Sequence, residues 1–118
     1  MPALNFQKRF APMVESGEKS QTIRATRKRP FKEGDTLYLY TGMRTKVCRK
    51  LGEVVCTGAV KFYLSDRCVQ VNGQSLLTPA GRDEFAWADG FTDMEDMAQW
   101  FEETHGLPFY GQLIKWGK

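Results

Sequence analysis

The eight residues GEKSQTIR, at positions 17–24, hold the side chains best suited to chemistry. An amine, a hydroxyl and a guanidinium lie within six residues, on Lys19, Thr22 and Arg24. Thr22 and Arg24 are two positions apart, so on an extended strand their side chains point to the same face. Lys19 precedes this strand at a turn, from which its long side chain can fold back over the other two. The alternative is an ordinary charged turn followed by an edge strand, and the spacing alone leaves both open.

These three side chains suit the hydrolysis of an amide. Such a reaction needs a nucleophile, a base that takes its proton and donors for the developing oxyanion. A neutral amine on Lys19 would activate the hydroxyl of Thr22, provided that the lysine pKa lies well below its usual value of about 10.4. Burial and a neighbouring cation such as Arg24 both lower a lysine pKa. For Arg24 itself we expect contact with a phosphate or the edge of a base, with a surface ion pair as the alternative.

The strands that must position these residues are predicted from β-rich stretches and turn residues. One extended segment begins at Thr22, and further strands are expected over 36–40, 51–64 and 109–116. Gly58 predicts a bulge or sharp bend within the long third stretch. Asn72-Gly73, flanked by apolar residues, predicts a hairpin.

Two or three helices are predicted around these strands. Apolar residues at helical spacing predict the first over about 6–16, with Gly17 as its stop signal. Thr78-Pro79 opens the second, because threonine caps helices well and proline is tolerated in the first turn. A capping box of Thr92 and Glu95 opens the third. The length of 118 residues indicates one domain, spanning 1–118.

The charges are distributed unevenly along the chain. Residues 1–50 carry twelve Lys or Arg and four Asp or Glu, a net charge of +8, whereas residues 51–118 carry five and ten, a net charge of −5. Residues 83–103 hold eight acids and no base. A basic half beside an acidic half suggests an anionic ligand near the first half. The alternative is that the two halves complement each other across the fold.

Two basic loops and an aromatic strand suggest a nucleic-acid surface. The first loop contains Arg27, Lys28 and Arg29, and the second contains Arg44 and Lys46. Tyr40 lies in the alternating strand between the loops. Cations bind phosphates and aromatic faces stack on bases, so these residues are candidates for binding RNA in a salt-sensitive manner. For Tyr40 the alternative is a place in the core.

Cysteine and histidine are used sparingly. Cys48, Cys56 and Cys68 are spaced too irregularly for a zinc pair, and their odd number argues against a disulfide framework. We interpret them as structural, with a reactive thiol at Cys48 as the alternative, because basic residues surround it. His105 is the only histidine, and we interpret it as a capping or surface residue. No cluster has metal-ligand spacing, so we expect neither a metal nor another cofactor.

Targeting signals are not evident in the sequence. No stretch approaches the ~20 apolar residues of a membrane span. The first residues, MPALNF, lack the charged block and the apolar block of a secretion signal. We therefore expect a cytoplasmic protein without a membrane partner.

Taken in this order, the motifs resemble those of the ASCH domain, a family of PUA-like β-barrels. Three segments carry the resemblance, which spans nearly the whole chain: GEKSQTIR after the first helix, KEGDTLYLYTG as a turn feeding a strand, and ADGFTDMEDMAQWFEETHG before a closing strand that ends LIKWG. The first segment is fairly specific, the second is generic and the third is moderately specific in its context.

The resemblance implies both a fold and a chemistry. Members of the family are associated with RNA binding, and some with hydrolysis. One small bacterial branch removes the acetyl group of N(4)-acetylcytidine with a lysine, a threonine and a glutamate. By motif these roles fall on Lys19, Thr22 and Asp89, where aspartate is one methylene shorter than the family's glutamate. Asp89 would hold the lysine or protonate the leaving exocyclic amine of cytosine.

We therefore expect an α+β fold, a small PUA-like mixed β-barrel decorated by two or three helices. Its cleft would bring Lys19, Thr22, Arg24 and Asp89 together to recognise RNA or a modified nucleoside and to hydrolyse an N-acylated cytidine amide. One alternative is a non-catalytic RNA-binding module that holds a flipped nucleotide in the same cleft. Another is a ribonuclease that uses the cleft's cations to stabilise charge on phosphorus.

Overall fold

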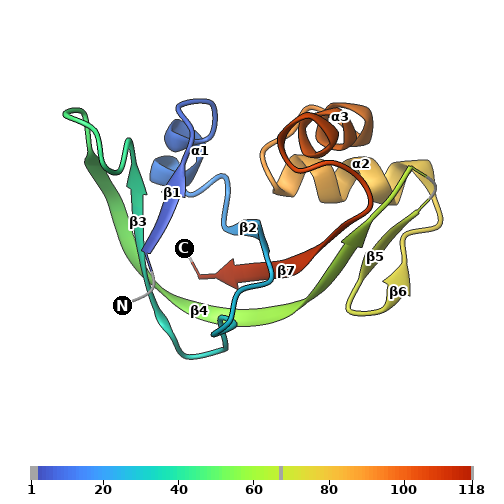
Figure 1. Cartoon of the computed structure of the whole chain (residues 1–118), viewed down its shortest axis with the longest axis horizontal. Helices are drawn as coiled ribbons and strands as arrows, with labels where there is room; N and C mark the ends of the chain where they lie inside the picture. The colour runs from blue at the N-terminus through green and yellow to red at the C-terminus, as the bar shows by residue number, and fades with distance from the viewer. Residues whose placement is uncertain (1–2, 67, 118) are drawn as a thin grey trace.

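The chain folds as a mixed α+β structure built on one seven-stranded sheet (Figure 1). The computed structural model describes residues 3–66 and 68–117. Within them the elements follow in this order: β1 (Ala3–Phe6), α1 (Ala11–Ser16), β2 (Gln21–Ala25), β3 (Thr36–Thr41), β4 (Arg49–Leu64), β5 (Val69–Val71), β6 (Gln74–Ser75), α2 (Pro79–Ala88), α3 (Met94–Thr104) and β7 (Phe109–Trp116). The α+β expectation is confirmed.

The long strand β4 connects the two halves of the molecule, curving beneath it in Figure 1. Its first part pairs with β3, and its second part pairs with β7 and, near its end, with β5. The register with β7 shifts between Cys56 and Gly58, where the predicted bulge is found. Glycine suits this site because a bulge bends the strand and increases its twist.

The sheet is not closed into a complete barrel. β1 runs parallel to β3 at one end, and β2 runs antiparallel to β7. Among the described residues no ladder joins β1 to β2. Arg24 of β2 instead donates a hydrogen bond from Nη2 to the backbone oxygen of Asn5 in β1, at 2.8 Å. A side chain therefore bridges the place where a closed barrel would have backbone pairing.

The predicted first helix is wrong in its first half. Residues 3–6 form β1, in which Leu4 and Phe6 are buried and their neighbours are exposed, a period of two rather than 3.6. The helix begins only at Ala11, with Pro12 in its first turn, where a missing backbone N–H costs no hydrogen bond. It ends as predicted at Gly17, which adopts a left-handed conformation with φ of 87°.

The two later helices begin close to their predicted caps. The Thr78 side chain accepts a hydrogen bond from the backbone N–H of Gly81, as expected for the cap of α2. The cap of α3 is Asp93, which accepts from the N–H of Asp96, and not Thr92 as predicted. No helix within residues 3–66 and 68–117 has the length and apolar character required to cross a membrane.

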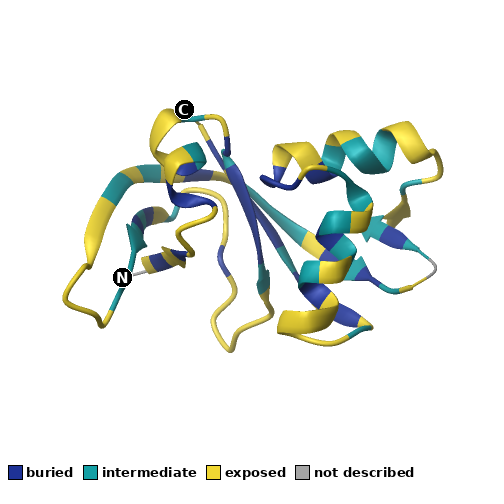
Figure 2. Cartoon of the chain, turned by 90° about the horizontal axis from the view of Figure 1, so that it is seen from above, coloured by how far each residue is buried: buried dark blue, intermediate teal, exposed yellow. Residues whose placement is uncertain are grey.

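Aromatic side chains bind the helices to one face of the sheet. Phe62 of β4 stacks on Phe85 of α2, with ring centroids 5.8 Å apart. Phe109 of β7 contacts Phe101 of α3, with centroids 4.9 Å apart. Buried positions, dark blue in Figure 2, follow the central strands and the sides of the helices that face them. The helices α2 and α3 therefore pack on one face of the β4–β7 pair.

Candidate functional site

A cavity of about 250 Å³ lies where β2, the segment after β1 and the helical region meet. It is lined by residues from all of these segments, including Lys19, Thr22, Arg24 and Asp89. The structure thus brings together the four residues that sequence reasoning assigned to one cleft. Three local features position them: the turn after α1, strand β2 and the end of α2.

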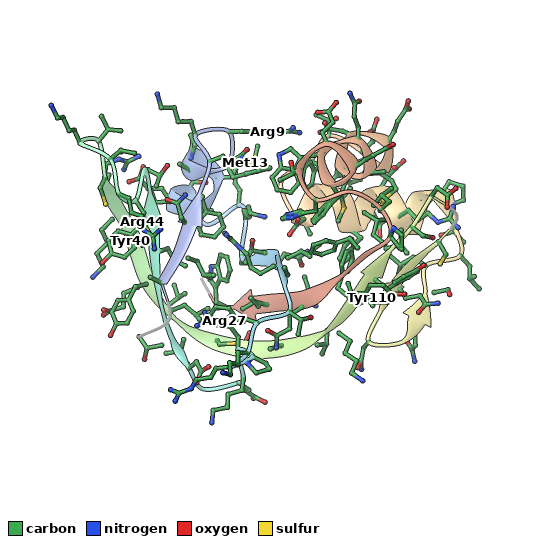
Figure 3. The ribbon with its side chains drawn as sticks, viewed as in Figure 1. Arg9, Met13, Arg27, Tyr40, Arg44 and Tyr110 are labelled. Carbon is green, nitrogen blue, oxygen red and sulfur yellow. The ribbon has the colours of Figure 1, made fainter. Side chains whose placement is uncertain are left out.

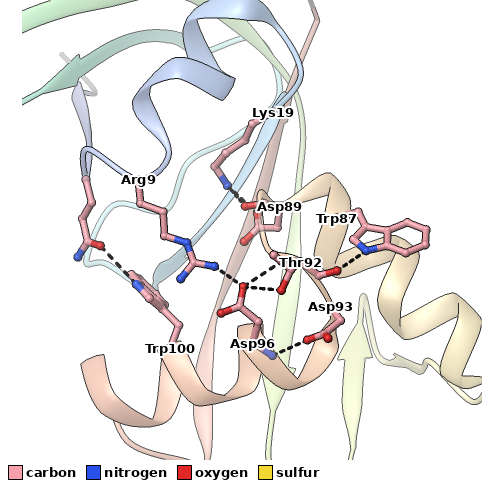
Figure 4. A network of polar contacts seen from close by, with 9 residues as sticks. Arg9, Lys19, Trp87, Asp89, Thr92, Asp93, Asp96 and Trp100 are labelled. Carbon is pink, nitrogen blue, oxygen red and sulfur yellow. Dashed lines mark hydrogen bonds and ion pairs between the residues drawn. The ribbon is translucent and has the colours of Figure 1, made fainter.

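Lys19 is directed into the protein by the turn that ends α1. Its backbone N–H donates to the oxygen of Met13, which holds the turn against the helix. Its Nζ donates to the backbone oxygen of Asp89 and lies 3.1 Å from Asp89 Oδ1 (Figure 4). The lysine and aspartate side chains are only 3% and 4% exposed. They therefore form a buried ion pair between segments 70 residues apart in the chain.

Asp89 is placed by the end of α2, where it is the capping residue. Gly90 follows with φ of 95°, a left-handed conformation that side-chain-bearing residues rarely adopt. A Cβ atom built at Gly90 would lie 2.9 Å from the Phe10 ring and 3.3 Å from Cδ of Lys19. The glycine therefore allows the aspartate, the lysine and the first aromatic wall of the cavity to approach one another.

Burial controls the ionisation of this pair. It lowers the pKa of Lys19, an effect that the attraction of Asp89 opposes. It likewise raises the pKa of the Asp89 carboxyl, against the attraction of Lys19. The Gln21 side chain, whose amide nitrogen has no hydrogen bond of normal geometry among the described residues, also favours the charged carboxylate. Burial therefore makes the neutral amine and the neutral acid easier to reach from the ion pair than they are for exposed groups, and these neutral forms are the ones that a general base and a general acid require.

Thr22 and Arg24 face the cavity from β2. The Arg24 Nε donates to Thr22 Oγ1 at 3.3 Å, and the guanidinium lies over the Phe6 ring, 4.9 Å from its centroid. Burial lowers the pKa of Arg24 to about 10, so the group is still a cation at neutral pH. This arrangement places a positive charge directly beside the threonine oxygen. Such a charge stabilises negative charge developing on that oxygen or on a bound carbonyl.

Aromatic rings form most of the cavity's remaining wall. Phe6, Phe10, Phe91 and Trp100 all line it. Phe10 packs edge-on against both Phe91 and Trp100, with centroids 5.2 Å and 5.9 Å apart. The combination of flat apolar walls with a few convergent polar groups is typical of sites for small planar ligands.

Two side-chain contacts tie the segment after β1 to α3 at the rim of the cavity (Figure 4). Arg9 forms an ion pair with Asp96 and also lies over the Phe91 ring, 4.9 Å from its centroid. Trp100 donates from its indole nitrogen to Gln7 Oε1 at 3.3 Å. These contacts hold the aromatic wall in place beside the buried ion pair.

The predicted nucleic-acid residues do not join this cavity. Arg27, Lys28 and Arg29 line a separate surface pocket with Phe31, over whose ring Arg27 lies at 4.6 Å. Tyr40 lies near the end of β3, and Arg44 and Lys46 lie in the exposed loop that follows. Figure 3 shows Tyr40 and Arg44 together at one end of the molecule and Arg27 below its centre. The two basic loops therefore belong to different surfaces.

His105 is the exposed capping residue that the sequence predicted, but it also borders the cavity, which the sequence did not predict. It caps the end of α3 as expected, yet its side chain lines the cavity with Thr104 and Trp100. Burial and the positive charge of Arg24 lower the pKa of His105, so its imidazole is neutral at pH 7. The one sequence signal for this position is that His105 follows Trp100 and Phe101 on the same helix. Aromatic residues at helical spacing are equally typical of an ordinary buried core, so the signal was not specific.

No metal centre or disulfide emerges within the described ranges. No group of three or more His, Cys, Asp or Glu within 3–66 and 68–117 is arranged to hold a metal ion. Cys48, Cys56 and Cys68 are all free thiols, and Cys56 is buried. Burial raises the pKa of the Cys56 thiol, which makes it a poor nucleophile. The polar side chains that line the cavity include Lys19, Thr22, Arg24, Asp89 and His105.

Comparisons of the chain with models of known protein families, with characterised proteins and with solved structures found no match.

Proposed function

We propose that this chain is an ASCH domain with a PUA-like strand arrangement and that it hydrolyses the amide of an N-acylated cytidine. The observation that carries the proposal is the buried pair of Lys19 and Asp89, which lines one cavity with Thr22 and Arg24. Burying two charges is costly and adds little stability compared with apolar packing. Perturbed ionisable groups in a cavity are therefore candidates for a functional site.

In the proposed reaction Thr22 is the nucleophile and Lys19 is its base. The neutral amine takes the hydroxyl proton as Thr22 Oγ1 attacks the acyl carbon. Arg24, which already donates to that oxygen, stabilises the negative charge of the tetrahedral intermediate. The intermediate collapses when the exocyclic amine of cytosine leaves with a proton from Lys19 or from Asp89. A water molecule then hydrolyses the acyl ester on Thr22 and regenerates the enzyme.

The size and walls of the cavity support a single nucleoside as substrate. A volume of about 250 Å³ lies just below the roughly 300–1,000 Å³ typical of small-molecule sites, a size that suits one nucleoside. The Phe10, Phe91 and Trp100 rings offer flat apolar surfaces against which a pyrimidine packs. The acyl group would then point toward Lys19 and Thr22.

The test is turnover of free N(4)-acetylcytidine, measured as release of cytidine. We expect Lys19→Met and Thr22→Val each to lower kcat by at least about 100-fold, since each removes a participant in proton transfer or bond formation. Lys28→Met and Thr57→Val are matched controls at exposed positions outside the cavity and should retain wild-type rates. Undiminished turnover in either cavity variant would remove that residue's role.

The same experiment separates the other two functions. A ribonuclease would cleave a short unmodified RNA and leave free acetylcytidine intact, because its chemistry requires a phosphodiester. A binding module would retain the nucleoside without converting it. Either result in place of cytidine release would overturn the proposed amidohydrolase.

A further inference from the structure

A pair of tyrosines occupies the sheet face that the helices leave uncovered. Tyr63 of β4 and Tyr110 of β7 are direct partners in the antiparallel register, so their side chains lie on one face. Their ring centroids are 4.8 Å apart. The adjacent residues Phe62 and Phe109 point to the opposite face, where they pack against α2 and α3. The tyrosine pair is thus separated from the cavity by the thickness of the sheet.

Tyr110 is open to solvent, whereas Tyr63 beside it is half-buried. Tyr110 is 67% exposed, and neither phenol hydroxyl forms a hydrogen bond with a residue in 3–66 or 68–117. Both rings line a groove of about 630 Å³ that also includes Lys61 and Gln70. Figure 3 shows Tyr110 on the outer side of the sheet, away from the helices. Large exposed aromatic surface with room beside it marks an interaction site.

One lysine lines this groove, and a basic loop begins at its edge. Lys61 lies two residues before Tyr63 and therefore shares its face. Thr26, at the groove's edge, continues directly into the basic loop 27–32, which Gln112 of β7 fixes by hydrogen bonds to the backbone N–H and oxygen of Phe31. Loop 26–35 carries four Lys or Arg and two Asp or Glu. Within the described residues none of these cations, nor Lys61, forms an ion pair.

The opposite face of the sheet is acidic. The eight acidic residues of 83–103 lie on and between α2 and α3, on the opposite face of the sheet. Next to the second basic loop, the two cations that open β4 are neutralised, because Arg49 pairs with Glu15 and Lys50 pairs with Glu53. Among the described residues, Lys61 is thus an unpaired cation beside the exposed ring of Tyr110, on the face of the sheet away from the acidic helices.

We propose that the Tyr63–Tyr110 groove binds single-stranded nucleic acid. An unpaired base stacks on the exposed ring of Tyr110, while Lys61 and the loop 27–32 neutralise the phosphates that follow it. An acidic peptide would satisfy the cations but not the aromatic rings, and a duplex would keep its base faces covered. This site is separate from the cavity and does not depend on the proposed amide hydrolysis.

The experiment measures the binding of fluorescently labelled ten-nucleotide RNA and DNA strands by anisotropy at low and moderate salt. Tyr110→Ala should weaken binding about 5- to 100-fold, whereas Tyr110→Phe, which keeps the stacking face, should stay within about 2-fold of wild type. Lys61→Ala should lower the salt slope by about one. Binding of RNA, DNA or both identifies which strand the groove accepts and supports the proposal.

Matched controls lie on the other basic surface. Tyr40→Ala and Lys46→Ala should bind as wild type, because these residues line neither the groove nor the 27–32 pocket. The proposal is overturned if neither strand binds, if a duplex of the same sequence binds as tightly as the single strand, or if the Tyr40 or Lys46 variant loses affinity while the Tyr110 variant does not. Measuring the hydrolysis of free acetylcytidine by Tyr110→Ala tests the cavity separately from the groove.

Discussion

Lys19 and Asp89 form an ion pair that the fold buries almost completely, with Nζ 3.1 Å from Oδ1 and side chains only 3% and 4% exposed. The lysine comes from the turn after α1, and the aspartate comes from the end of α2. Nζ also donates to the backbone oxygen of Asp89, so the lysine holds both the side chain and the main chain of its partner. This double contact joins the turn after α1 to the end of α2.

The first prediction concerns the stability that depends on this pair. Lys19→Met should lower the free energy of unfolding by about 3–5 kcal/mol at pH 7, because it leaves the Asp89 carboxylate buried without its partner. Adding Asp89→Asn should recover at least about 2 kcal/mol, since no unpaired charge is then buried. Urea unfolding of both variants measures the effect. A double variant less stable than Lys19→Met would contradict it.

The second prediction is the pH dependence of the Lys19→Met variant. Burial raises the Asp89 pKa, and loss of Lys19 removes the attraction that lowers it. The folded state then binds a proton more tightly than the unfolded state, whose aspartate titrates near pH 3.8. Stability is therefore greatest below that pH and falls as pH rises toward the folded pKa, by about 1.4 kcal/mol per unit. Unfolding measured from pH 4 to pH 8 should show this fall, and it should disappear in the variant that also carries Asp89→Asn.

The third prediction is the pH dependence of the proposed hydrolysis. Lys19 must be neutral to act as a base, and burial lowers its pKa from 10.5. The rate should therefore rise with pH until it reaches that lowered pKa. Because Lys19 and Asp89 titrate together, the pKa seen in the rate belongs to the pair and not to the lysine alone. Lys19→Arg retains a cation that does not deprotonate, so its rate should be low at every pH. A rate for wild type that does not change between pH 5 and pH 9 would exclude a lysine base.

Local sequence suggested the part of the site that lies within one segment, although spacing alone left an ordinary charged turn as the alternative. Lys19, Thr22 and Arg24 are joined by a turn and a strand, and all three line one cavity. Asp89 is different, because only the resemblance to a known motif connected it with Lys19. Its position depends on how α2 packs against the sheet, and residue spacing carries no information about that contact.

Long-range pairing explains what the sequence did not predict. β1 forms because Leu4 and Phe6 become buried against β3, a parallel partner more than thirty residues away. Tyr63 and Tyr110 meet through a register of β4 and β7 that begins with a bulge. The role of Trp100 in the cavity wall could not be predicted either, because a buried stripe on a helix has the same periodicity whether it contacts a sheet or lines a cavity.

The fourth prediction tests how Gly90 supports the site. Gly90→Ala should destabilise the protein by about 1–3 kcal/mol, since it adds a Cβ 2.9 Å from the Phe10 ring at a backbone φ of 95°. Gly106→Ala is a matched control, because its φ is 81° but no atom lies within 4 Å of the added Cβ. The extra loss in the Gly90 variant, measured by thermal unfolding, reports crowding alone. Equal losses in both would show that backbone strain is the whole effect.

The fifth prediction assigns His105 to ligand binding and not to the chemical step. Its ring packs on Phe109, with centroids 4.9 Å apart, and borders the cavity on the side of Arg24. His105→Phe keeps the packing and removes both ring nitrogens, so the free energy of unfolding should change by less than about 1 kcal/mol. If the neutral imidazole hydrogen-bonds the substrate, KM for acetylcytidine should rise about 5- to 20-fold while kcat stays within 2-fold. A fall in kcat at unchanged KM would instead place His105 in the reaction itself.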